Sequence, residues 1–153
     1  MKEMLLISGC LFGLNCRYKG DNKKLKQLKK LQKKYLLIPV CPEQLGGLST
    51  PRPPSYFIEG DGKDTIAGEN NLINEQGENV SKHFRKGAYE VLKVCKQLNI
   101  TKALLKERSP SCGVNKIFLG EKLTAGRGVT SFLLLANGLT VLSEKQYTRM
   151  EIT

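Results

Sequence analysis

The sequence contains no tryptophan and only one histidine, His83, among its 153 residues. It also lacks an apolar run of membrane-spanning length, and the run near the N-terminus extends only from Met4 to Ile7. A signal peptide or a membrane span needs a longer apolar stretch. We therefore expect a cytoplasmic protein without a membrane partner. The length fits one hydrophobic core, which predicts a single domain over residues 1–153.

The cysteines form neither an even set nor a CxxC pair. An odd number without an export signal argues against a disulfide framework. The absence of paired spacings argues against a structural zinc site, which normally has four ligands. In a reducing compartment the thiols are therefore candidates for metal binding, nucleophilic chemistry or core packing. The five are Cys10, Cys16, Cys41, Cys95 and Cys112.

Positive charge is in excess, with a formal net charge of +11. Much of it lies in one segment, where leucines recur at three- and four-residue steps between lysines. This pattern predicts an amphipathic helix from Asn22 to Tyr35 with a basic outer face. A solvated face is the simpler interpretation, and attraction of an anionic ligand is the alternative. The lysines are Lys23, Lys24, Lys26, Lys29, Lys30, Lys33 and Lys34.

The order of apolar segments predicts an α/β protein, with a Rossmann-like, open and mostly parallel sheet flanked by helices. The residues between Tyr56 and Leu72 are expected to form a hairpin or an ordered excursion. Strands are expected at Met4–Ser8, Leu36–Val40, Ala103–Leu105 and Leu139–Leu142, and further helices at Asn79–Leu98, at Gly128–Leu135 and from Ser143 onward.

Three of the cysteines follow predicted strands. Cys10, Cys41 and Cys112 come at or shortly after the ends of separate strands, and ligands of parallel α/β sheets bind beyond these carboxyl ends. Converging thiolates suit zinc, copper(I) or an iron–sulfur cluster. Cys16 lies in the loop after Cys10 and could be a fourth ligand, a free thiol or packing. Cys95 lies on the apolar stripe of its helix and is interpreted as core.

Four segments around these cysteines resemble the thiouracil desulfidase family. The resemblance extends over essentially the whole chain, and the second and third segments are long enough to be specific. Residues 77–88 also resemble the family. The four segments are SGCLFGLNCRYKG (residues 8–20), PVCPEQLGGLSTPRPPS (39–55), KERSPSCG (106–113) and GRGVT (126–130).

The resemblance implies a [4Fe-4S] cluster held by Cys10, Cys41 and Cys112, with one iron open to substrate. It also implies non-redox removal of sulfur from thiolated uracil, such as 4-thiouracil or 4-thio-UMP, as hydrogen sulfide. By motif position, the family's essential glutamate and serine fall on Glu43 and Ser109. From the residues alone, a first-turn carboxylate and a turn hydroxyl would be the simpler interpretations.

Three arginines in the same segments, Arg17, Arg52 and Arg108, could bind a substrate phosphate, although ion pairs with acidic neighbours are equally compatible with them. The expected partner is thus a small thiolated pyrimidine or nucleotide, and the protein is expected to be a monomer or a homodimer. Two alternatives stay open. One is a zinc or thiol-redox protein, and the other is a binding module for thiolated RNA. The RNA alternative is disfavoured because no aromatic residues are interleaved with the lysines.

Overall fold

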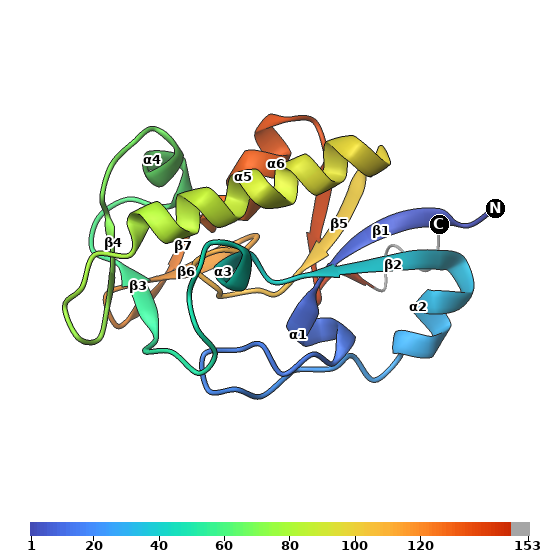
Figure 1. Ribbon diagram of the computed structural model, residues 1–153, viewed down its shortest axis with the longest axis horizontal. Helices are drawn as coiled ribbons and strands as arrows, with labels where there is room; N and C mark the ends of the chain where they lie inside the picture. Colours follow the sequence, from blue (N-terminus) through green and yellow to red (C-terminus); the bar gives the residue numbers. More distant parts are fainter. Residues whose placement is uncertain (148–153) are drawn as a thin grey trace.

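A parallel four-stranded sheet forms the centre of the computed structural model, which describes residues 1–147 (Figure 1). Its strand order is β2-β1-β5-β8, and every neighbouring pair is parallel. The predicted α/β class and the four predicted strands are confirmed, with boundaries shifted by one residue at most. These strands are β1 (Glu3–Ser8), β2 (Tyr35–Val40), β5 (Lys102–Leu105) and β8 (Thr140–Ser143).

Side chains of the central strands alternate between two apolar layers. On β1, Leu5 and Ile7 pack with Leu28 and Leu31, whereas Leu6 faces the opposite layer. This alternation follows from the two-residue period of a strand, and it explains the continuous apolar runs of strands buried on both faces. The helices of the two layers are α1 (Gly9–Phe12) and α2 (Leu28–Lys34) on one side, with α5 (Ser81–Leu98) and α6 (Val129–Ala136) on the other.

A second sheet extends the molecule beyond the parallel one. Its order is β4-β3-β6-β7, with two antiparallel pairs joined by the parallel pair of β3 and β6. The expected excursion after Tyr56 is present as β3 and β4 with α4 between them, whereas the β6–β7 hairpin was not predicted. The bounds are β3 (Ser55–Phe57), α4 (Gly62–Ile66), β4 (Leu72–Asn74), β6 (Lys116–Leu119) and β7 (Lys122–Ala125).

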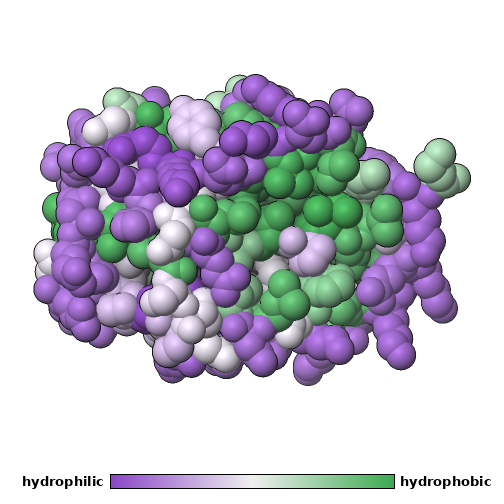
Figure 2. Space-filling view, in the orientation of Figure 1, coloured by the Kyte–Doolittle hydropathy of each residue, from purple (hydrophilic) through white to green (hydrophobic). Residues whose placement is uncertain are grey.

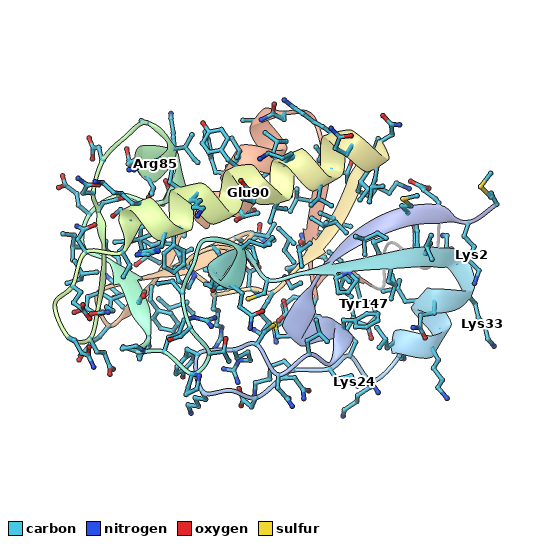
Figure 3. The ribbon with its side chains drawn as sticks, viewed as in Figure 1. Lys2, Lys24, Lys33, Arg85, Glu90 and Tyr147 are labelled. Atoms are coloured by element: carbon cyan, nitrogen blue, oxygen red, sulfur yellow. The ribbon has the colours of Figure 1, made fainter. Side chains whose placement is uncertain are left out.

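The lysine-rich helix is shorter than predicted. The prediction began at Asn22, but α2 begins at Leu28, and Tyr35 already belongs to β2. The preceding residues are held in another conformation, because the backbone N–H of Lys23 donates to Cys10 and that of Leu25 donates to Leu11, each at 3.0 Å. The leucine spacing still predicted burial correctly. Figure 3 shows Lys24 and Lys33 directed away from the body of the protein.

Helix α3 (Pro42–Leu45) lies directly against α5, and two glycines permit this contact. A Cβ atom on Gly46 would collide with the His83 carbonyl, and one on Gly87 would collide with the Pro42 carbonyl. His83 Nδ1 also donates to the Gly46 carbonyl at 2.8 Å. The single histidine therefore fixes α3 on α5, and this contact positions the residues that follow Cys41.

The surface is divided by polarity. Figure 2 shows polar side chains around the periphery of this face and apolar ones gathered between α5 and β2. Leu36, on the edge strand β2, is 50% exposed. In the part of the chain that the structure describes, no helix is long and apolar enough to cross a membrane. Most of the helix predicted to start at Ser143 lies outside the described residues, and Ser143 itself ends β8.

Candidate functional site

Four of the five thiols line one cavity at the carboxyl ends of the parallel strands. Cys10 lies in α1 after β1, Cys41 follows β2, and Cys112 lies in the loop after β5. Cys16 reaches the same cavity from the loop after α1. The volume is about 440 Å³, within the range of small-molecule sites. By contrast, Cys95 is buried in the core between α5 and the sheet, where the apolar stripe of its helix placed it.

The thiols perturb one another and are shielded from water. Burial, followed by the charge of Cys112, raises the pKa of Cys10 to about 12. Burial, followed by the charge of Glu43, raises the pKa of Cys112 to about 12. The Cys41 thiol donates a hydrogen bond to Cys16, which raises the pKa of Cys41 and lowers the pKa of Cys16. Cys10, Cys41 and Cys112 are therefore protonated at neutral pH, and a metal that bound them would have to displace their protons.

Glu43 lies in the first turn of α3, after Pro42, and its side chain turns into the cavity. It is only 9% exposed. Its Oε1 accepts a hydrogen bond from Ser111 Oγ at 2.8 Å and lies 3.9 Å from Cys41 Sγ. Its Oε2 lies 3.6 Å from Arg52 Nη2. A buried carboxylate is thus held between a hydroxyl and a guanidinium, directly beside the thiols.

Ser109 is held in the turn before Cys112. Its Oγ accepts backbone N–H bonds from Ser111 at 3.2 Å and from Cys112 at 3.1 Å. With both lone pairs occupied, its own proton is left to donate to Ser111 Oγ, 3.0 Å away. Ser111 in turn donates to Glu43, so the hydroxyls form a chain that ends on the carboxylate. The family resemblance pointed to Ser109, whereas Ser111, which is fully buried, was not among the predicted site residues.

Glu107 organises the segment that carries Cys112. Its Oε1 accepts backbone N–H bonds from Val114, Asn115 and Lys116 at 2.8 to 3.0 Å, and its Oε2 accepts one from the Asn115 side chain at 3.1 Å. Burial alone would raise the pKa of Glu107, but these four donors outweigh it and lower the pKa. Arg108 follows with a positive φ of 70°, a conformation rare outside glycine, so the turn into the Cys112 loop is a strained one.

The three candidate arginines lie in different surroundings around the cavity. Arg108 is exposed, Arg17 is paired with Asp21 at 2.8 Å, and the Arg52 guanidinium is turned inward. Among residues 1–147, no three histidine, cysteine, aspartate or glutamate side chains are grouped closely enough to hold one metal ion.

The sequence profile of the 2-thiouracil desulfurase family matches residues 5–146. The chain belongs to this family. The Bacillus subtilis (strain 168) protein YbbK, described as uncharacterised, is 40% identical over 147 residues, covering 94% of this chain and 97% of the relative. A solved structure described as the [4Fe-4S]-dependent thiouracil desulfidase TudS is similar with a TM-score of 0.86 and 36% identity, covering 99% of this chain and 97% of TudS.

In this desulfurase-family chain, the motif segments surround the cavity from different sides. Residues 8–20, 39–55 and 106–113 all contribute to its lining. The segment GRGVT lies behind them, where its backbone N–H groups bond to the loop after β5. Val129 donates to the Pro110 carbonyl at 2.9 Å, and Thr130 donates to the Ser111 carbonyl at 2.8 Å. The fourth segment therefore supports the Cys112 loop and is absent from the cavity lining.

Proposed function

We propose that this protein is an iron–sulfur-dependent desulfidase, which converts a thiolated uracil or its nucleotide to the oxygen form and releases hydrogen sulfide. The observation that carries the proposal is the meeting of Cys10, Cys41 and Cys112 in one cavity beside Glu43. Membership of the 2-thiouracil desulfurase family supports the reaction, and the likeness to TudS supports the cofactor.

The donor set fits a four-iron, four-sulfur cluster. Soft thiolates are the preferred ligands of iron–sulfur clusters, and each thiolate binds its own iron, so the sulfur atoms need not surround a single point. Cys10, Cys41 and Cys112 would hold the cluster, and Cys16 is the remaining thiol of the cavity. When bound through three thiolates, such a cluster supplies a thiophilic Lewis-acid iron with an open position.

The residues of this chain supply the proton chemistry in the proposal. Glu43 takes a proton from the water that attacks the sulfur-bearing carbon, or returns one to the ring. The hydroxyls of Ser109 and Ser111 orient the Glu43 carboxylate, because their hydrogen bonds run toward its Oε1. Burial of this network keeps bulk water from competing for the carboxylate. The ring keeps its oxidation state, so no external reductant is consumed.

A nucleotide substrate suits the rim of the cavity. Arg108 is exposed there, with Lys23 and Lys106 also in the lining, and arginine binds phosphate with two parallel hydrogen bonds. We expect a higher kcat/KM for 4-thio-UMP than for 4-thiouracil, and Arg108→Ala should lower the value for the nucleotide alone. Equal efficiencies for the two compounds would contradict the phosphate contact and leave the desulfidase reaction standing.

The test begins with anaerobic cluster reconstitution. The wild type should become brown, bind iron and acid-labile sulfide, and release hydrogen sulfide from a thiouracil. Cys41→Ala should lose both the visible absorbance and the sulfide release. Cys95→Ala is the matched control, because its thiol lies in the core away from the cavity, and it should keep both. A colourless wild type that releases no sulfide from any thiouracil would refute the proposal.

A further inference from the structure

The Arg52 guanidinium is the most enclosed cation of the cavity described above. Its side chain is only 8% exposed, although arginine is seldom buried without partners. One terminal nitrogen, Nη2, donates to the Cys16 carbonyl at 3.0 Å. The other, Nη1, donates to Thr50 Oγ1 at 3.0 Å and to the Ser49 carbonyl at 3.3 Å. The side chain therefore joins the Cys16 loop to the segment after α3.

The same nitrogen that contacts the Cys16 loop also faces the carboxylate. Arg52 Nη2 lies 3.6 Å from Glu43 Oε2, while Glu43 Oε1 accepts from Ser111. The two oxygens of Glu43 are thus contacted by side chains from two different segments of the chain. The backbone is fixed as well, since the Arg52 N–H donates to the Tyr18 carbonyl at 2.9 Å.

These contacts engage both terminal nitrogens of the Arg52 guanidinium, so few donors are left for a substrate phosphate. Its donors are directed at two carbonyls, a hydroxyl and a carboxylate, all belonging to the protein. A phosphate would have to displace this carboxylate or these carbonyls, and it would leave Glu43 buried without its positive partner. That loss is unfavourable because an unpaired buried charge is costly.

We propose that Arg52 is a positioning residue for desulfuration, which holds the Glu43 carboxylate and the Cys16 loop in place, and that it does not bind the substrate phosphate. The inference rests on the proposed function only for its kinetic consequences. The contacts between Arg52, Glu43 and the Cys16 loop also contribute to the stability of the folded chain, and that property can be measured without any substrate.

The kinetic test compares Arg52→Lys and Arg52→Met with the wild type, on both 4-thiouracil and 4-thio-UMP. Lysine keeps the charge but cannot span the same partners, so kcat should fall about 10-fold for Lys and about 100-fold for Met, as misplacement of a reacting group predicts. KM and the ratio of kcat/KM between the two substrates should stay near the wild-type values, and iron and sulfide content should be unchanged. A loss confined to the nucleotide would overturn the proposal in favour of a phosphate contact.

Arg85→Met is the matched control for losing a structural arginine. Arg85 projects from α5 toward α4 (Figure 3), where it donates to the carbonyls of Thr65 and Glu69. We expect this variant to unfold at a lower temperature while its kcat stays at the wild-type value. If Arg85→Met lowered kcat as much as Arg52→Met, the effect would be a general loss of stability and the proposal would be wrong.

A double-mutant cycle gives a readout independent of turnover. Arg52→Met leaves Glu43 buried and unpaired, whereas Arg52→Met combined with Glu43→Gln removes that charge. The double variant should therefore have a higher Tm than Arg52→Met alone, in the full-length protein. Additive losses would overturn the positioning role. If the wild type released no sulfide from any thiouracil, the proposed function would fail, while this cycle would still decide the contact.

Discussion

Replacing Glu107 by glutamine is expected to lower the stability of the protein by about 4 kcal/mol. The carboxylate accepts four hydrogen bonds, from Val114, Asn115 and Lys116. Hydrogen bonds to a charged group contribute roughly 1 kcal/mol more than neutral ones, which accounts for about 3 kcal/mol across the three backbone donors. The amide of glutamine then faces the Asn115 amide donor, and losing that bond adds about 1 kcal/mol. For a chain of this length, the expected fall in Tm is about 8–16 °C.

The pH dependence of the Tm difference between the wild type and Glu107→Gln tests whether the charge of Glu107 causes it. The pKa of Glu107 is lowered in the folded protein, so its ionised form contributes stability above the ordinary carboxyl pKa. That contribution is lost as the pH falls through the folded-state pKa. The Tm difference between wild type and Glu107→Gln should therefore be constant above about pH 5 and narrow below it.

The assay is thermal unfolding followed by circular dichroism, with the cluster-free protein kept under reductant. Glu90→Gln is the control, because Glu90 is partly exposed and forms an ion pair with Lys93 on the helix surface, and the Tm of this variant should hardly change. A Tm for Glu107→Gln within 2–3 °C of the wild type at neutral pH, about 1 kcal/mol, would refute the hydrogen-bond argument. A Tm difference that stays constant below about pH 5 would also refute the argument.

Three further outcomes are expected. Ser111→Ala should lower kcat about 10- to 100-fold with the cluster retained, because Glu43 loses its hydroxyl donor. An unchanged kcat in steady-state kinetics would contradict this prediction. Gly87→Ala should destabilise the protein by at least about 1–3 kcal/mol, measured by urea unfolding, because its Cβ would collide with the Pro42 carbonyl. Exchange of Lys29 and Lys33 for glutamine should leave sulfide release unchanged, since both lie on an exposed face; a clear loss would assign that face a role.

The sequence predicted the parallel sheet because its strands are buried on both faces and read as continuous apolar runs. It did not predict β6 and β7, because most of their side chains are exposed and each strand begins with an exposed lysine, Lys116 or Lys122. The predicted start of α2 was wrong for a different reason. Leucine spacing reported burial correctly, but backbone bonds from Lys23 and Leu25 to α1 replace the first helical turns.

Placement of the candidate site was predictable only where it depends on topology. Parallel strands bring their carboxyl ends to one edge, so the convergence of Cys10, Cys41 and Cys112 could be inferred before any coordinates. The contacts among side chains could not. Ser111 and Glu43 are 68 residues apart, and the Arg52 contact with the Cys16 loop spans 36 residues. Local sequence contains no information on which donors meet across such separations.

The distribution of the three thiols along the chain also constrains when the cavity can be completed during synthesis. Cys10 and Cys41 become neighbours once β1 and β2 pair, but Cys112 must wait for β5, which lies next to β1 on its other side. A nascent chain that ends within β5 thus carries two of the three thiols proposed as ligands and an unfinished cavity. If all three thiols hold the cluster, as proposed, its insertion would be a late event in biogenesis that follows the long-range assembly of the sheet.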